Sequence, residues 1–512
     1  MNRPQWVLGD SLLQMAAQLP GGTAVLADGQ AHTYEEFADA SLRLARGLQD
    51  LGVARGDRVV IQLENSWHCA VSIFGASLAG TVFVVVNPQT KPDRLAYILG
   101  DSGASVLIAE NQALSALDET EYELPALRHK LSDGGPTAGA VRLNHVIERS
   151  ETAPRAGPPI PVDLAALIYT SGTTGEPKGV MMTHSSMVFA VESVARYLRL
   201  GDGERILNVL PLAFSYGLHQ LTLAVRTGST LVLERSFAFP ANTVNQMREH
   251  EVTVVPGVPT IFGTLLGMRD IAPIVSVRRV TNAGAAIPRQ YVDGVHALFP
   301  NALVFLMYGQ TECKRISYLE PELAREKPLS VGKAMPGTEA YVLRADGRRA
   351  SPGEVGILHV RGSHVMVGYW GKPDLTNEKL QKGTHSGDCV LRTDDFFRQD
   401  ADGYLYFVGR TDDMINTRGE KVSPLELENV LLSIPAVREA IAVGVPDELL
   451  GEAVRAVLVL KDGERLTEQE VKRFCRTRVE SALVPKEVRF VDELPKTAAG
   501  KIQRSALDAP TA

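Results

Sequence analysis

The segment YTSGTTGEPKG at residues 169–179 has the clearest chemical signature in the chain. Its eleven residues include five hydroxyl side chains, three glycines and one lysine. Backbone N–H groups, short hydroxyls and a lysine can surround phosphate oxygens, and glycine permits the close approach that this requires. The candidate phosphate ligands are Thr170, Ser171, Gly172, Thr173, Thr174, Gly175 and Lys178.

Taken alone, a segment of this composition is also typical of a flexible surface loop. Here it stands between the apolar runs LAALIY and VMMTH, which predicts a tight turn between two strands. The Walker A pattern GxxxxGK[ST] does not fit, because Pro177 precedes the lysine and Gly179 follows it. A P-loop kinase is therefore disfavoured.

Three other places carry groups suited to reactions at a phosphate. Glu312 in YGQTE offers a hard carboxylate oxygen of the kind that Mg²⁺ prefers. Two adjacent carboxylates, Asp394 and Asp395, open the segment DDFFRQDADGYLYFVGR, and Lys501 stands in the tail segment PKTAAGKIQR. Taken alone, each of these residues could also be a solvated surface side chain. Whether it has a role in a reaction must be judged from the segment around it.

Six segments, in order along the chain, resemble the core motifs of the adenylate-forming superfamily. This superfamily includes acyl-CoA synthetases, adenylation domains of peptide synthetases and luciferases. The resemblance covers essentially the whole chain, and it implies formation of an acyl-AMP from ATP and a carboxylic acid, followed by acyl transfer to a thiol. The segments are YTSGTTGEPKG (169–179), GAAIP (284–288), YGQTE (308–312), TDDFFRQDADGYLYFVGR (393–410), GRTDDMINTRGEKVSP (409–424) and PKTAAGKIQR (495–504).

The resemblance also implies roles for single residues. Lys501 would bridge the attacking carboxylate and the α-phosphate, and Thr311 and Glu312 would be catalytic, with Glu312 binding Mg²⁺. The usual TGD of the family reads Thr393-Asp394-Asp395 here, which leaves open which acid contacts ribose, although the spacing to DGYLYFVGR favours Asp395. The implied adenine and ribose ligands are Gly284, Ala285, Ala286, Tyr308, Gly309, Asp395 and Arg410, with Tyr308 stacked on adenine.

The same resemblance divides the chain into three parts. Residues 1–410 would form the adenylation domain, residues 411–413 a hinge, and residues 414–512 a mobile C-terminal lid that carries Lys501. Asp412 occupies the hinge position, and Gly419 lies on the loop that would line the tunnel for the thiol.

The acid would lie against the segment 208–220 and the end of the strand that precedes YGQTE, with Phe214, Ser215, Met307 and Cys313 as pocket residues. Relatives that activate amino acids, including free-standing prolyl-carrier-protein ligases, have an Asp at the position of Ser215. A neutral serine cannot compensate a buried ammonium group, so we expect an acid without an α-amine. Met307 favours small or medium acids. Lys314 and Arg315 could reach a polar tail of the substrate, but we expect them to face solvent.

The thiol acceptor remains open at this stage. CoA and the phosphopantetheine arm of an acyl or peptidyl carrier protein present the same reacting end, and both are possible partners. Two alternatives remain for the reaction: a prolyl-like amino-acid carrier-protein ligase with an altered pocket, and a luciferase-like oxygenase that shares the adenylation motifs.

The composition of the chain argues against several other classes of protein. The 512 residues are 45% apolar and have a net charge of −7, which fits a folded chain of several domains without the basic surface that nucleic acid requires. Four dispersed cysteines form no CxxC pair, and the N-terminus does not read as a signal peptide, so we expect a cytoplasmic protein. The uncharged stretch 69–86 changes from helical to β-branched character and predicts a buried helix and strand, with no membrane span.

These residues require an α/β framework to position them. Helical and strand patterns alternate, with helices expected at 33–52 and 242–251 and strands at 57–64, 104–110 and 252–258, which predicts parallel sheets covered by helices. Past residue 340, short strands with turn signals predict a small β-rich subdomain. Beyond residue 410, helices at 424–434 and 467–479 and strands between them predict a small α+β domain.

Overall fold

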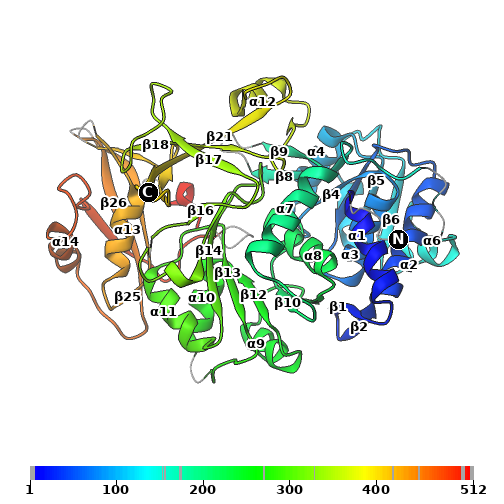
Figure 1. Cartoon of the computed structure of the whole chain (residues 1–512), viewed down its shortest axis with the longest axis horizontal. Helices are drawn as coiled ribbons and strands as arrows, with labels where there is room; N and C mark the ends of the chain where they lie inside the picture. The colour runs from blue at the N-terminus through cyan, green and yellow to red at the C-terminus, as the bar shows by residue number, and fades with distance from the viewer. Residues whose placement is uncertain are drawn as a thin grey trace.

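The computed structural model describes residues 6–152, 154, 157–171, 176–268, 271–327, 329–417, 420–447, 450–496 and 502–507. In Figure 1 the elements near the N-terminus, such as α2, β6 and α6, lie at the opposite end of the molecule from α13, α14, β25 and β26. The predicted α/β class is confirmed, with a large N-terminal part and a smaller C-terminal unit.

Two mixed sheets form the large part. The first has the strand order β19-β9-β8-β4-β3-β5-β6-β7. The strands from β8 to β7 in this order are parallel to one another, whereas β9 pairs antiparallel with both β8 and β19. Its central strands are continuous runs of buried aliphatic residues, as both-sided burial between helices requires. The bounds are β3 Arg58–Gln62, β4 Val82–Val85, β5 Val106–Glu110, β6 His129–Asp133, β7 Val141–Arg142, β8 Leu164–Ser171, β9 Pro177–Thr183 and β19 Gly368–Tyr369.

The second sheet has the order β16-β15-β14-β13-β12-β10-β11-β1-β2, with antiparallel strands at both edges. Parallel neighbours β12, β13 and β14 end side by side, so the segments that follow them meet at one edge of the sheet. The bounds are β1 Thr23–Ala27, β2 Gln30–Thr33, β10 Arg205–Asn208, β11 Thr230–Leu233, β12 Val254–Gly257, β13 Arg279–Asn282, β14 Leu303–Tyr308, β15 Ser317–Leu319 and β16 Lys333–Ala334.

Helices cover these sheets. Helix α2 begins with the predicted capping box, in which the Thr33 hydroxyl accepts from the Glu36 N–H and the Glu36 carboxylate accepts from the Thr33 N–H. The helix bounds are α1 Leu8–Gln18, α2 Tyr34–Asp50, α3 Trp67–Leu78, α4 Pro92–Ser102, α5 Asn111–Asp118, α6 Leu143–Arg149, α7 His184–Tyr197, α8 Ser215–Thr227, α9 Pro240–Glu249, α10 Pro259–Gly267 and α11 Arg289–Leu298.

The uncharged stretch 69–86 forms the end of α3 and the strand β4, with a turn between them. This confirms the predicted change from helix to strand. Among the residues that the structure describes, no helix is long and apolar enough to cross a membrane.

A third sheet forms the predicted β-rich region and continues to residue 410. Its order is β17-β18-β21-β20, and β22 pairs with β21 in an antiparallel register that places Asp395 opposite Arg410. The bounds are η1 Pro321–Leu323, β17 Glu339–Leu343, β18 Val355–Arg361, α12 Pro373–Lys379, β20 Leu380–Lys382, β21 Cys389–Gln399 and β22 Leu405–Arg410.

The C-terminal unit is an α+β fold with its own apolar core. Its sheet has the order β24-β23-β26-β25, with β27 parallel to β26. The bounds are β23 Ile415–Thr417, β24 Glu420–Val422, α13 Pro424–Leu432, β25 Val437–Asp447, β26 Gly451–Leu460, α14 Glu468–Arg476, β27 Glu487–Phe490 and η2 Arg504–Ala506.

The start of α1 is attached to the body of the protein by a buried histidine. The Leu8 N–H donates to Nδ1 of His184 over 3.2 Å, and burial lowers the pKa of His184 from 6.5 to about 4. Between these two pH values the unfolded chain binds a proton at His184 and the folded chain does not. Stability that depends on this group is therefore lost as the pH falls from about 6.5 to 4.

We expect the free energy of unfolding to fall by about 3 kcal/mol over this window through His184. Urea denaturation of the wild type and of His184→Gln, measured at pH 7 and pH 4.5, isolates the contribution, because other titrating groups affect both proteins. The variant should show the smaller loss. Parallel pH profiles for the two proteins would contradict the assignment.

Candidate active site

The glycine-rich segment joins β8 to β9, as the sequence predicts. These strands pair antiparallel, with Thr170 opposite Lys178. The Tyr169 hydroxyl donates to Asp101 over 2.5 Å and fixes the base of the turn. Of the predicted phosphate ligands, Gly172, Thr173, Thr174, Gly175 and the side chain of Ser171 lie outside the described residues.

A buried carboxylate, Asp395, lies where β21 faces the turn after β14. Its Oδ2 accepts from the Tyr308 hydroxyl and, over 2.7 Å, from Gln310, and Nε of Arg410 lies 3.6 Å from Oδ1. The side chain is only 6% exposed, and burial raises its pKa although these partners favour the charged form. Oδ1 accepts no hydrogen bond from the described residues, so it is available to a ligand donor.

Asp394 has a different environment. Its carboxylate forms ion pairs with Lys379 and Arg392, and its backbone has a φ of +59°. Of the two adjacent acids, Asp395 is the one held beside Tyr308, whereas the charge of Asp394 is already balanced by two cations. This arrangement agrees with the choice that the spacing favours.

Glu312 lies on the same turn as Tyr308, half-buried, with Oε1 accepting from the Tyr369 hydroxyl over 2.7 Å. Nζ of Lys178 lies 5.8 Å from the centre of the Tyr369 ring. Tyr369 therefore links the Glu312 carboxylate to the lysine of the glycine-rich segment. Thr311 precedes Glu312 on this turn and is also half-buried.

The predicted adenine contacts come from two neighbouring strand ends. Gly284, Ala285 and Ala286 follow β13 and are exposed, and Gly284 has a φ of +88°, which favours glycine. The Tyr308 ring at the end of β14 packs edge-on against Phe397, with 4.8 Å between centroids. At Gly309 a Cβ would lie 2.3 Å from the carbonyl oxygen of Lys314, so this turn has no room for a larger residue.

The predicted acyl-pocket residues also converge on this region. Phe214 and Ser215 stand at the start of α8, both half-buried, and Met307 and Cys313 are buried on either side of the β14 end. The Tyr197 hydroxyl donates to the sulfur of Met307 over 2.9 Å, which fixes the thioether against α7.

The expectation that Lys314 and Arg315 face solvent is wrong. Lys314 is 5% and Arg315 is 6% exposed, because the turn folds back until the Ile316 N–H donates to the Tyr308 carbonyl. Lys314 reaches this position with a φ of +58°, a backbone conformation that lysine rarely adopts. Burial, and to a smaller extent the charge of the adjacent Arg315, lower its pKa to about 7.

The predicted hinge lies directly after β22. Asp412 is exposed in a turn whose flanking N–H groups donate to Asp394 and Arg410 carbonyls. Arg504 lies 3.6 Å from Asp413 and 2.8 Å from Glu428, which attaches the end of the chain to this turn. Lys501 and Gly419 lie outside the described residues, so their predicted roles have no geometry here.

Several residues around the site were missed by sequence reasoning. Gln310 stands inside the quoted motif YGQTE, where its amide could have been recognised as a second donor to a carboxylate. Tyr197, His219 and Tyr369 carry no pattern of their own and become neighbours of the site only through the packing of α7, α8 and β19.

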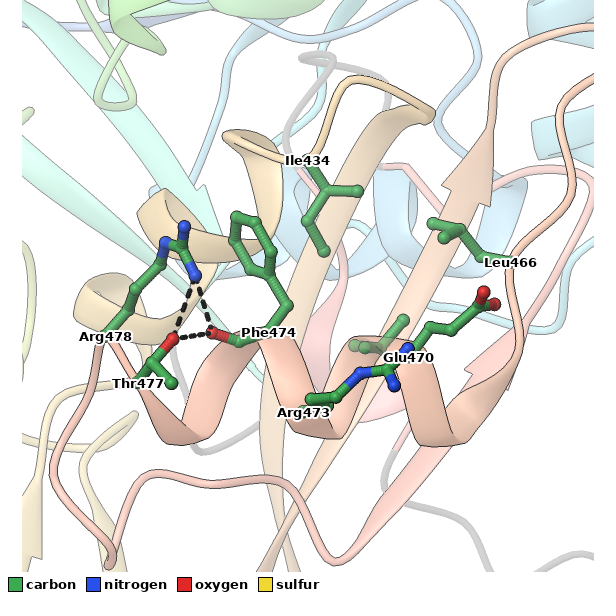
Figure 2. A pocket seen from close by; sticks show the side chains of 8 residues that line it. Ile434, Leu466, Glu470, Arg473, Phe474, Thr477 and Arg478 are labelled. Atoms are coloured by element: carbon green, nitrogen blue, oxygen red, sulfur yellow. Dashed lines mark hydrogen bonds between the residues drawn. The ribbon is translucent and has the colours of Figure 1, made fainter.

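A shallow pocket of about 400 Å³ lies elsewhere, on the C-terminal unit beside α14. Figure 2 shows Arg478 turned toward Phe474, and its guanidinium lies 3.7 Å from the ring centre while donating to Thr477 and to the Phe474 carbonyl. Glu470 accepts from the Thr467 N–H at the start of α14. These polar groups already have structural partners, so we assign no chemistry to this pocket.

The chain is similar to known CoA ligases and synthases along almost its whole length. The chain is 34% identical to a feruloyl-CoA synthase of Amycolatopsis sp over 97% of both chains, and 32% identical to the long-chain-fatty-acid–CoA ligase of Escherichia coli O157:H7, over 98% of this chain and 94% of that one. A solved anthranilate CoA ligase in complex with anthranoyl-AMP superposes with a TM-score of 0.90 at 27% identity, covering 98% of this chain and 96% of the other.

The fold and the site therefore define an adenylate-forming ligase. The model of the AMP-binding enzyme family matches residues 12–370, and that of the AMP-binding enzyme C-terminal domain matches residues 426–501. The chain belongs to the AMP-binding enzyme family, and within it to the ATP-dependent, AMP-forming acid–CoA ligases.

The two adjacent acids give a direct test of the ribose assignment. Asp395→Asn should lower kcat/KM for ATP by about 10- to 100-fold, since a charge-assisted hydrogen bond to a hydroxyl is lost while the shape is kept. Asp394→Asn is the matched control and should change it less than about threefold. Steady-state pyrophosphate release at varied ATP measures both, and equal losses in the two variants would contradict the assignment.

Proposed function

We propose that this ligase activates a small or medium carboxylic acid that has no α-amine, and that the site around Asp395 and Glu312 holds ATP for this reaction. The observation that carries the proposal is the single turn after β14. It brings a buried ribose-type acceptor, held by Tyr308 and Gln310, next to the Glu312 carboxylate.

In the first step a carboxylate oxygen of the acid attacks the α-phosphorus of ATP, and the bond to the β-phosphate oxygen breaks. The products are acyl-AMP and pyrophosphate. In the second step a thiol sulfur bonds to the acyl carbon, AMP leaves with the electron pair of the broken carbon–oxygen bond, and the thiol proton is lost to solvent. Such reactions depend mainly on positioning and on stabilising charge on the phosphates.

Glu312 fits a magnesium ion that arrives with ATP. Mg²⁺ keeps several waters and takes one or two protein carboxylates plus phosphate oxygens, so a cluster of acids is not required. Among the described residues there is no group of three His, Cys, Asp or Glu that could hold a metal. A bound Mg²⁺ would neutralise phosphate charge, while Tyr369 orients Glu312 and Lys178 adds a positive charge nearby.

The absence of an α-amine in the substrate follows from charge. Ser215 is neutral, and the guanidinium of Arg315 lies 4.7 Å from the centre of the Tyr216 ring, the residue next to Ser215. A substrate ammonium in this pocket would meet a like charge and find no carboxylate at position 215.

For the acceptor we propose CoA, because the relatives above are named as CoA ligases. A carrier-protein phosphopantetheine stays as the second candidate on the segments similar to prolyl-carrier-protein ligases. Pyrophosphate release and hydroxamate formation across a panel of acids, followed by mass spectrometry of reactions with CoA and with a holo carrier protein, test the proposal. If no acid supports pyrophosphate release, it fails.

We also propose the domain division at 1–410, 411–413 and 414–512, Gly419 in the thiol tunnel, and a cytoplasmic location. The domain division and the role of Gly419 rest on the motif positions and on the turn after β22, which joins two parts with separate apolar cores. The location rests on the four dispersed cysteines and the N-terminal sequence.

Lys501 is expected to act in the first step alone. Lys501→Ala should slow acyl-AMP formation by about 10²- to 10³-fold, because one positive charge at the transition state is lost. Thioester formation from supplied acyl-AMP should be nearly unchanged. Lys496→Ala is the control, since Lys496 forms an ion pair with Glu439 at 2.8 Å. ATP–pyrophosphate exchange at the wild-type rate in Lys501→Ala would refute the role.

The hinge assignment is tested by restricting φ at one residue. Asp412→Pro should hold the C-terminal domain near one orientation and lower one half-reaction at least about tenfold more than the other. Asp412→Ala, which keeps backbone freedom, should affect both half-reactions little. The two half-reactions are measured separately by pyrophosphate exchange and by transfer from supplied acyl-AMP, and equal losses would count against a hinge.

A further inference from the structure

Two adjacent cations, Lys314 and Arg315, are buried without an acidic partner. Neither forms an ion pair with any residue that the structure describes, and the Lys314 Nζ and the Arg315 Nε make no hydrogen bond within that part of the chain. The Arg315 Nη1 donates weakly, over 3.4 Å, to the Lys314 carbonyl. The described buried polar network is therefore incomplete at this place.

An imidazole adds to the same cluster. His219 on α8 is 2% exposed, and neither of its ring nitrogens has a partner among the described residues. Its pKa lies well below the usual value because of burial first, and then because of the charges of Arg315 and Lys314. Within the described part of the chain, the Lys314 Nζ, the Arg315 Nε and both ring nitrogens of His219 therefore have no hydrogen-bond partner.

Buried unpaired charges destabilise a protein, and Arg cannot relieve the cost by losing its proton. The turn nevertheless holds both side chains inward, with Lys314 in the left-handed backbone region. Strained conformations and uncompensated charges of this kind are retained where a ligand completes them. An anion would complete the cluster.

The cluster lies beside residues that we propose for the acid pocket. The Arg315 guanidinium lies over the Tyr216 ring of α8, whose hydroxyl is hydrogen-bonded to Thr281. Arg315 also acts on the Tyr197 hydroxyl, which donates to the sulfur of Met307, through its charge and a side-chain hydrogen bond. Arg315 therefore lies against α8 and the end of β14, which belong to the segments that the resemblance assigns to the acyl group, and against Tyr197 of α7.

We propose that the acid activated by this enzyme carries a second anionic group, a carboxylate or a sulfonate, at the end remote from the reacting carboxyl, and that Lys314 and Arg315 bind it. This rests on the proposed function, because it assigns the substrate of the same site. A planar guanidinium suits bidentate binding of a carboxylate or a sulfonate, and the ammonium of Lys314 adds a second charge. The neutral Ser215 and the length limit set by Met307 agree with a short dianion.

The test compares matched acids. Pyrophosphate release is measured with α,ω-dicarboxylates of three to six carbons, with ω-sulfonated acids of the same lengths, and with the monocarboxylates of equal chain length. The wild type should prefer a dianion over its monocarboxylate by about 10- to 100-fold in kcat/KM, the effect of charge-assisted hydrogen bonds to a buried partner. The better of the carboxylate and sulfonate series identifies the remote group.

Variants assign the preference to the cations. Lys314→Met and Arg315→Met keep the apolar length of the side chains and should reduce the dianion preference by about 10-fold or more, whereas Arg315→Lys should keep part of it. Lys382→Met, at an exposed lysine on β20, is the control for loss of a positive charge and should keep the full preference. Thermal melting checks folding, and removal of an unpaired buried charge should not lower Tm.

Each outcome decides a different point. If monocarboxylates are activated as well as dianions, the inference is wrong while the proposed function stands. If Arg315→Met loses monocarboxylates and dianions equally, the cations bind the reacting carboxyl or ATP, and the inference is again wrong. If no acid releases pyrophosphate, the proposed function itself fails. Should the variants not fold, the acid panel on the wild type alone still supports or refutes the dianion preference.

Discussion

The turn between β14 and β15 is the constraint on which the candidate site depends. Gly309 allows its two ends to approach, the Ile316 N–H closes it on the Tyr308 carbonyl, and Lys314 takes a left-handed backbone conformation within it. Because the turn is so short, it places several functions within a few residues: the Tyr308 hydroxyl on Asp395, the Glu312 carboxylate on Tyr369, and the cations of Lys314 and Arg315 in the core. A change of turn length would displace all of them together.

The two sides of this turn differ in the charge of their buried side chains. On one side a buried acid, Asp395, has neutral and cationic groups around it, and its Oδ1 accepts no hydrogen bond from the described residues, which suits the hydroxyls of a sugar. On the other side, Lys314, Arg315 and the imidazole of His219 lie beside aromatic rings and have no acidic partner among the described residues, which suits an anion. The net charge of −7 gives no indication of either environment, since both are local and buried.

The connection between the large part and the C-terminal unit joins a paired strand, β22, to an exposed turn. The β21–β22 pairing brings Arg410 opposite Asp395, and the exposed Asp412 follows two residues later. A movement at this turn would act on a chain segment whose preceding residue is already held at the ribose-type acceptor. The proposed hinge therefore begins directly after a residue that is paired with Asp395.

The class of fold and the type of reaction could be predicted from the sequence alone. Apolar runs and helical periodicity predicted β3, β5, β12, α2 and α9, because the burial of an element leaves a hydrophobic pattern in its own sequence. The resemblance of six ordered motifs predicted acyl-AMP formation. The roles of the individual site residues remain predictions, several of them on residues that the structure does not describe. The buried environment of Lys314 and Arg315, in contrast, is visible only in the folded chain. Adjacent cations in a sequence are usually solvated, and nothing local shows that a turn folds them inward against α7 and α8. Burial is a property of the packed elements together, so it becomes visible only when they are assembled.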